Sequence, residues 1–206
     1  MLVVVVPPSF PLFQSPFFTS LCDVTESEGW ISFGRNIPST SLNTLYIREC
    51  YRTIASSINP GGINKAIITG TPGIGKSLFL IYLLWKLVKE GKRVLFIYHS
   101  DTIYYDGQGG VFYCPENSLP TSNEVAFWSD DLLCLLNAKG KEEKHLSAFP
   151  YELCTFIVST SPRRDMVNDF KKPPPPKVFY MPLWTATELE TIAPCFSAVI
   201  DWRTRF

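Results

Sequence analysis

Eight consecutive residues have the spacing G-x-x-x-x-G-K-S, which is typical of loops that bind the phosphates of nucleotides. They are Gly70, Thr71, Pro72, Gly73, Ile74, Gly75, Lys76 and Ser77. Glycine lets the backbone curl tightly, so that N–H groups can approach a polyphosphate closely. Lys76 can reach the β- and γ-phosphates, and the hydroxyl of Ser77 can bind a magnesium ion. The pattern predicts a site for a nucleoside triphosphate, ATP or GTP, with Mg²⁺. A glycine-rich turn without a ligand is the alternative.

A magnesium ion held by Ser77 and the phosphates needs an acidic partner at the end of another strand. The apolar run 125–128 is expected to be such a strand, and Asp130 and Asp131 follow it. We assign Asp130 to the metal and Asp131 to the attacking water, although the two carboxylates could exchange these roles. Capping of a helix that begins near Leu132 is the alternative function of this acidic pair.

Polar residues also follow a second apolar run, 153–158. Ser159 or Thr160 could contact the γ-phosphate, because groups at this end of a nucleotide-binding sheet face the ligand. Arg163 and Arg164 could neutralise charge on a transferring phosphoryl group, within one chain or across a subunit boundary. A turn with two solvent-exposed arginines is the alternative.

The segments around the loop predict an α/β fold. Strands are expected at 65–69 and 93–98, whose apolar runs 66–68 and 94–98 are typical of parallel strands buried on both faces. Between them, residues 77–89 lack Gly and Pro and precede Gly91, which predicts a helix. Further strands are expected at 125–128, 153–158 and 178–181.

Other segments complete this scheme. Apolar residues recur at helical spacing within 42–58, and 102–113 carries an Asp-Gly turn between strand-forming residues, as in a β-hairpin. Thr185 and Glu188 form a capping box for a last helix, and the proline run at 171–177 predicts an extended spacer. The expected fold is a P-loop NTPase with a mostly parallel central sheet of about five strands, flanking helices and an inserted β-hairpin.

The composition indicates a globular chain with a substantial core. Of 206 residues, 46% are apolar, and 19 basic residues balance 19 acidic ones. This balance does not support nucleic-acid binding, and no apolar run reaches the length of a membrane span. Residues 7–38 are rich in Pro, Ser and Phe, so 1–41 is interpreted as an arm or linker and 42–206 as the nucleotide-binding domain.

Four blocks of the chain resemble the P-loop NTPase region of Crinkler effector proteins from oomycetes and fungi. They are residues 45–51, 68–77, 160–164 and 179–189, and the order of the P-loop with Ser-Pro-Arg-Arg and Met-Pro-Leu-Trp-Thr is its most specific part. Residues 1–7 resemble the motif that closes the Crinkler targeting region, with Met1 in place of its histidine. By this resemblance the chain is expected to be truncated at both ends.

The resemblance implies ATP binding and hydrolysis, secretion into a host cell and action in the host nucleus. It also implies a host protein target or a missing C-terminal effector domain as partner. A magnesium-dependent ATPase module is therefore the leading hypothesis. A nucleotide-dependent interaction module without hydrolysis, which could depend on contacts within an oligomer, is the second. A nucleotide or nucleoside kinase is the third.

Overall fold

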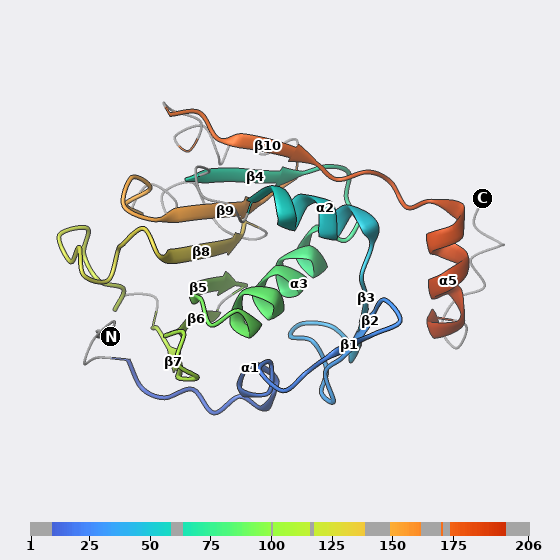
Figure 1. Ribbon diagram of the computed structural model, residues 1–206, viewed down its shortest axis with the longest axis horizontal. Helices are drawn as coiled ribbons and strands as arrows, with labels where there is room; N and C mark the ends of the chain where they lie inside the picture. The colour runs from blue at the N-terminus through green and yellow to red at the C-terminus, as the bar shows by residue number, and fades with distance from the viewer. Residues whose placement is uncertain are drawn as a thin grey trace.

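A seven-stranded sheet lies at the centre of the molecule (Figure 1). The computed structural model describes residues 10–58, 64–99, 101–115, 118–138, 149–161, 170 and 174–196. The strands occur in the order β10-β4-β9-β8-β5-β6-β7. Their bounds are β4 Lys65–Thr69, β5 Arg93–Tyr98, β6 Asp101–Tyr105, β7 Val111–Tyr113, β8 Leu132–Asn137, β9 Thr155–Ser159 and β10 Lys177–Tyr180.

The sheet is mixed, which corrects the expectation of a mostly parallel sheet of about five strands. Strands β10, β4, β9, β8 and β5 pair in parallel, so their carboxyl ends meet at one edge. Strands β6 and β7 continue the sheet in antiparallel pairing. They form the expected hairpin, but β6 pairs directly with β5, so the hairpin is part of the central sheet. The chain also contains helices, and the predicted α/β class is confirmed.

One strand lies elsewhere than predicted. Residues 125–128 form turns, and the strand of this region is β8, where a helix was expected to begin near Leu132. A short apolar run such as 132–136 is compatible with a strand or a buried helix, and local periodicity does not distinguish them. In the structure β8 lies between β5 and β9 and forms a ladder with each of them. This pairing decides the conformation.

Helix α3, Lys76–Lys89, packs against one face of the sheet and confirms the predicted helix after the loop. Helix α2, Glu49–Ile58, lies beside it, but the first part of the expected helix 42–58 is strand β3, Thr44–Tyr46. Strand β3 pairs with β2, Trp30–Ser32, which in turn pairs with β1, Glu26–Ser27. This pairing of β3 outweighs the helical period of its residues.

The described part of the N-terminal segment packs against the rest of the chain. It contains helix α1, Pro16–Thr19, and apolar side chains that join the core around α3. Among them are Phe17, Phe18, Leu21, Ile31, Phe33 and Ile37. The indole of Trp85 on α3 donates to the carbonyl of Val24 at 3.0 Å. Whether residues 1–41 form a unit separate from the domain stays a prediction.

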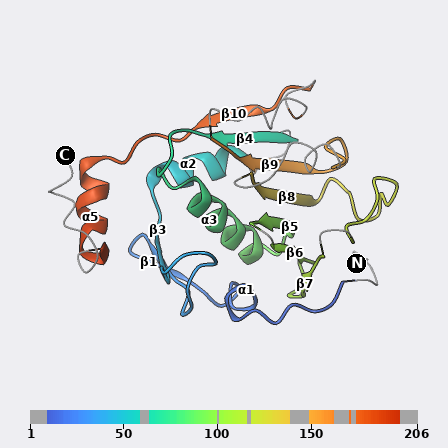
Figure 2. The ribbon, with the colours of Figure 1, turned by 180° about the vertical axis from the view of Figure 1, so that it is seen from behind.

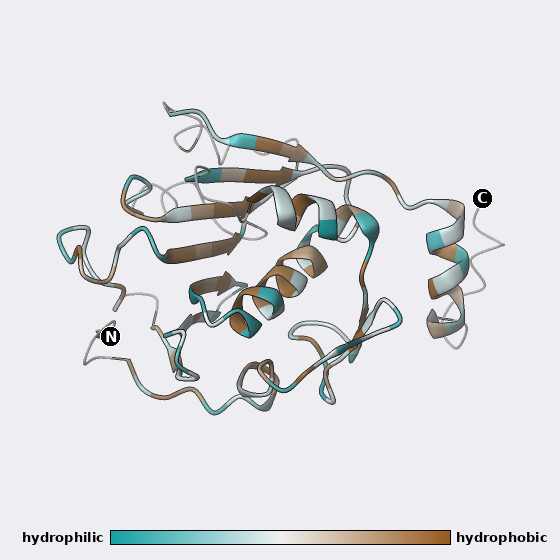
Figure 3. Ribbon diagram, viewed as in Figure 1, coloured by the Kyte–Doolittle hydropathy of each residue, from teal (hydrophilic) through white to brown (hydrophobic). Residues whose placement is uncertain are grey.

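Both faces of the central strands are buried, whereas the edge strand β10 is largely exposed. Figure 3 shows that the central strands consist mostly of apolar residues. Along β5, Phe96 faces the core around α3, while Leu95 and Ile97 face a second core. The second core includes Trp128 and Phe156. Because the strands are held on both sides, their carboxyl ends form a fixed edge on which a binding site can be built.

Helix α5, Ala186–Phe196, stands beyond the arrowheads of the parallel strands in both Figure 1 and Figure 2. The predicted capping box is present, because the Thr185 N–H donates to the Glu188 carboxylate at 2.9 Å. The Glu188 N–H in turn donates to the Thr185 hydroxyl at 3.2 Å. The chain reaches this helix from β10 past the end of β4, where the Met181 N–H donates to the Thr69 carbonyl at 2.8 Å.

Candidate functional site

The loop 70–75 connects the carboxyl end of β4 to the first turn of α3. Gly70, Gly73 and Gly75 have positive φ angles of 142°, 83° and 95°. The loop borders a cavity of about 380 Å³, within the size range of small-molecule sites. The cavity is lined by Pro72, Gly73, Gly75, Lys76, Ser77, Leu78, Asn137, Ser159, Thr160 and Ser161. The structure thus gathers most of the predicted loop residues around one cavity.

Three successive carbonyl groups of the loop are held by side chains of other elements. The indole of Trp184 donates to the Gly73 carbonyl at 3.4 Å, and the Arg48 guanidinium donates to the Ile74 carbonyl at 2.9 Å. The Tyr51 hydroxyl donates to the Gly75 carbonyl at 2.7 Å. These donors belong to the segments that begin α2 and precede α5, so both segments support the loop from the same side.

The position of these carbonyls determines where the N–H groups of the loop point. In a planar trans peptide the C=O of one residue and the N–H of the next point in opposite directions. The N–H groups of Ile74, Gly75 and Lys76 are therefore turned away from the supporting side chains. The first N–H groups of α3 have no acceptor within the helix and carry its positive dipole end. This arrangement is suited to bind an anion.

Only glycine fits at position 75. Its φ of 95° is costly for other residues, and a Cβ atom there would collide with the Tyr51 hydroxyl. The same hydroxyl holds the Gly75 carbonyl, so the close approach of Tyr51 and the missing side chain are parts of one arrangement.

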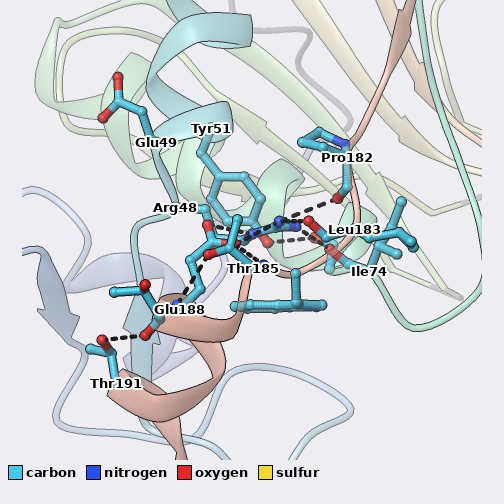
Figure 4. A network of polar contacts seen from close by, with 12 residues as sticks. Arg48, Glu49, Tyr51, Ile74, Pro182, Leu183, Thr185, Glu188 and Thr191 are labelled. Atoms are coloured by element: carbon cyan, nitrogen blue, oxygen red, sulfur yellow. Dashed lines mark hydrogen bonds and ion pairs between the residues drawn. The ribbon is translucent and has the colours of Figure 1, made fainter.

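Arg48 is the centre of the supporting network (Figure 4). Its side chain is 1% exposed and forms a two-point ion pair with Glu188, at 2.9 Å and 3.0 Å. It also donates to the carbonyls of Pro182 at 3.2 Å and Leu183 at 2.8 Å, and it lies over the Trp184 ring at 4.2 Å. Because it also donates to the Ile74 carbonyl, the guanidinium joins three segments that are distant in sequence: the start of α2, the loop and the segment before α5.

The ionisation of this network follows from its burial and pairing. Burial opposes the charge on Glu188, but the hydrogen bond from Arg48 and the bonds with Thr185 outweigh it and lower the pKa of Glu188. Burial likewise opposes the charge on Arg48, whereas Glu188 raises its pKa. For Tyr51, burial dominates and raises the pKa well above its usual value. Arg48 and Glu188 are therefore charged, and Tyr51 is a neutral donor.

The side chain of Lys76 reaches back from α3 to the start of the loop. Its ammonium group donates to the carbonyls of Gly70 at 2.7 Å and Thr71 at 2.8 Å. Burial lowers the pKa of Lys76. Since the ammonium group is already positioned beside the cavity, an incoming phosphate could take the place of these carbonyls as its partner.

The wall opposite the loop is formed by the ends of β8 and β9. Asn137 ends β8, is 2% exposed and donates from its side-chain amide to the Ser77 hydroxyl at 3.2 Å. Ser159 and Thr160, at the end of β9, are buried and line the same cavity. The predicted position of Thr160 beside the phosphate loop agrees with this geometry, and its contact with a γ-phosphate stays a prediction.

The structure does not bring Asp130 and Asp131 to the cavity. They precede β8, at the amino edge of the sheet, because the strand expected before them is absent. Asn137 lies six positions after Asp131 along the extended chain, which corresponds to about 20 Å. Asp131 pairs instead with Arg93 at 2.9 Å, at the start of β5. Burial opposes its ionisation, but Ser129 and Arg93 outweigh this effect and lower its pKa.

Two other predicted residues, Arg163 and Arg164, lie outside the described residues. Among the described residues there is no group of three or more His, Cys, Asp and Glu side chains that could hold a metal ion. The described residues that line the cavity carry no carboxylate, and the Ser77 hydroxyl accepts a hydrogen bond from the neutral amide of Asn137. This donor set does not match the carboxylate ligands that Mg²⁺ prefers.

Several site residues were missed from the sequence. Asn137 could have been found, because it is the first polar residue after the apolar run 132–136. Arg48 and Tyr51 gave no such signal, since a basic and an aromatic residue in a polar segment are usually solvent-exposed or part of a core. Both lie in the blocks on which the family resemblance rests, as do Trp184 and Glu188.

No protein-family model matches the chain. It is similar to Crinkler effector protein 15 and Crinkler effector protein 16 of Phytophthora infestans, with 40% identity over 198 residues in each comparison. Each alignment covers 93% of this chain and 31% of the relative. The chain therefore spans about a third of the length of these curated relatives. In the part of the chain that the structure describes, no helix is long and apolar enough to cross a membrane.

Replacing Glu188 with Gln tests the supporting network. The change leaves the buried guanidinium of Arg48 without its counter-charge, and we expect a loss of about 3 kcal/mol in the free energy of unfolding at pH 7. The pKa of folded Glu188 lies below its ordinary value of 4.5, so its contribution is complete above that pH and is lost as pH falls through the lower value. Urea unfolding at pH 7 and pH 3 would measure both effects.

Glu190→Gln is the matched control, because Glu190 lies on the same helix and is exposed. It should change the stability by less than about 0.5 kcal/mol at either pH. Equal stability of the Glu188→Gln variant and the wild type at pH 7 would contradict the proposed role of the ion pair.

Replacing Asp131 with Asn tests its assignment to the amino edge. Asp131 is 44% exposed, so loss of its pair with Arg93 should reduce the stability by about 1 kcal/mol or less. Affinity for ATP, measured by titration, should not change, because the residue lies far from the cavity. A tenfold or greater loss of affinity in a folded variant would return Asp131 to the binding site.

Proposed function

We propose that this chain, whose similarity to Crinkler effector proteins supports its assignment to the Crinkler family, binds a nucleoside triphosphate on the loop 70–77. The observation that carries the proposal is the hydrogen bonding of the carbonyls of residues 73–75. These bonds turn the next three N–H groups away from the supporting side chains. A triphosphate seated there would accept hydrogen bonds from a backbone that is already in place.

Charge supports the same ligand. Lys76 is the charged residue among those that line the cavity within the described part of the chain. Its ammonium group donates to the carbonyls of Gly70 and Thr71 beside the cavity, and a phosphate could take the place of these acceptors. The dipole of α3 adds a second positive contribution at the same place. We take ATP as the test ligand, and a P-loop NTPase fold is the corresponding proposal for the architecture.

The family assignment suggests where this binding would be used. The relatives are named Crinkler effector proteins, and we propose that the chain is the nucleotide-binding module of a secreted, host-directed effector. Its action in the host nucleus and its host partner are parts of the same proposal. ATP hydrolysis is the more demanding form of the function, since it needs a group that activates water.

A nucleotide-dependent interaction module without rapid hydrolysis is the second candidate. The amide of Asn137 favours it, because an amide beside Ser77 is a poor ligand for Mg²⁺ and a poor general base. Helix α5 provides a route from such a site to a partner. It is joined to the loop through Glu188, Arg48 and the Ile74 carbonyl.

Replacing Lys76 with Ala tests nucleotide binding. Loss of charge-assisted hydrogen bonds to two phosphates should weaken ATP binding by about 100-fold, equivalent to about 3 kcal/mol. Titration with a fluorescent ATP analogue, followed by displacement with ATP and GTP, would measure the affinity and the base preference.

Lys86→Ala is the matched control, because Lys86 lies on the same helix and its ammonium group faces Glu90 at 3.7 Å. This variant should bind ATP as the wild type does. The proposal is wrong if the wild type and the Lys76→Ala variant bind ATP equally weakly, or if both lysine variants lose the same affinity.

A further inference from the structure

The residue that faces Ser77 across the cavity is an amide. Asn137 stands at the carboxyl end of β8, one strand beyond β9, and is almost completely buried. Its side-chain nitrogen lies 3.2 Å from the Ser77 hydroxyl oxygen, and both residues line the cavity. A residue in this position would be next to the phosphates of a nucleotide bound on the loop.

A carboxylate would be expected there if the protein held the magnesium ion of a bound nucleotide. Magnesium takes oxygen ligands, and proteins supply them mainly as carboxylates together with substrate phosphates. The amide of Asn137 has one neutral oxygen and an NH₂ group that can only donate. In this structure the NH₂ group donates to Ser77, so the hydroxyl that would bind a metal is already engaged.

The remaining lining residues do not replace the missing charge. Within the described part of the chain, Lys76 is charged, and the other lining residues are apolar or carry hydroxyl or amide groups. Asp130 and Asp131, which come directly before β8, stand at the opposite edge of the sheet. Among the described residues, the positive charge available to hold a triphosphate therefore comes from the ammonium group of Lys76 and from the backbone N–H groups.

We propose that Asn137 makes nucleotide binding at this site nearly independent of Mg²⁺, by presenting an amide where a metal-binding site would present a carboxylate. Asn137 acts as a positioning residue that fixes the Ser77 hydroxyl. This inference rests on the proposed nucleotide binding and specifies its chemistry: the ligand is a nucleoside triphosphate held by the protein through its phosphates.

The test is to measure the affinity for ATP in Mg²⁺ and in EDTA for the wild type and for Asn137→Asp. The wild-type affinity should differ by less than about threefold between the two conditions. In Asn137→Asp, the carboxylate repels the phosphates in EDTA and binds the metal when Mg²⁺ is present. Its affinity should therefore be at least about tenfold higher in Mg²⁺ than in EDTA.

Two controls accompany this measurement. Asn137→Ala removes the amide without adding charge and should keep the weak dependence on Mg²⁺. Asp130→Asn changes an acid at the amino edge of the sheet and should also leave the dependence unchanged. If Asn137→Asp does not fold, the wild type and the alanine variant still test the inference, through the ratio of their ATP affinities in Mg²⁺ and in EDTA.

The outcomes separate this inference from the proposed function. Tight ATP binding by the wild type in Mg²⁺ with a loss of tenfold or more in EDTA would overturn the inference and leave the proposed function standing. The same result follows if Asp130→Asn, rather than Asn137→Asp, changes the dependence on Mg²⁺. Failure of the wild type to bind ATP in either condition would overturn both.

Discussion

The buried guanidinium of Arg48 is the interaction on which the shape of the phosphate loop depends. A charge that is removed from water is costly unless it is paired and fully hydrogen-bonded. Here Glu188 supplies the counter-charge, and three backbone carbonyls accept the remaining donors. Because one of these carbonyls belongs to Ile74, satisfying the guanidinium also sets the direction of the loop backbone. The start of α2, the loop and the segment before α5 are thus held by one side chain.

This constraint fixes the backbone of the loop through contacts within the protein itself. Tyr51 and Trp184 hold the neighbouring carbonyls, so the proposed binding of a phosphate would not require the loop backbone to reorganise. Lys76 would exchange its present partners, the carbonyls of Gly70 and Thr71, for phosphate oxygens in the proposed complex. The same network joins the loop to α5, which begins with the capping box that also contains Glu188. A change in the loop would therefore act directly on the first turn of that helix.

The sheet separates groups that are close in sequence. In a parallel strand, one end faces the loop edge and the other faces the opposite edge, about 20 Å away for a strand such as β8. The predicted strand, 125–128, ends just before Asp130 and Asp131, whereas β8 begins just after them. The prediction therefore placed Asp131 at the cavity and missed Asn137. Asp131 instead has a structural role, because it forms an ion pair with the partly buried Arg93. Most of the other elements were predicted correctly, because their apolar runs are bounded by Gly, Pro or a capping residue.

The sequence by itself determined the glycine-rich loop between β4 and α3, helix α3, strands β4 and β5, the hairpin β6–β7 and the capping box of α5. Each of these depends on local rules of backbone geometry, hydrogen bonding or apolar periodicity. Only the tertiary structure decided which residues complete the site, since Arg48 and Glu188 are 140 positions apart and meet only after folding. It also decided that Asn137 faces Ser77, because the pairing of β8 between β5 and β9 fixes which end of that strand reaches the loop.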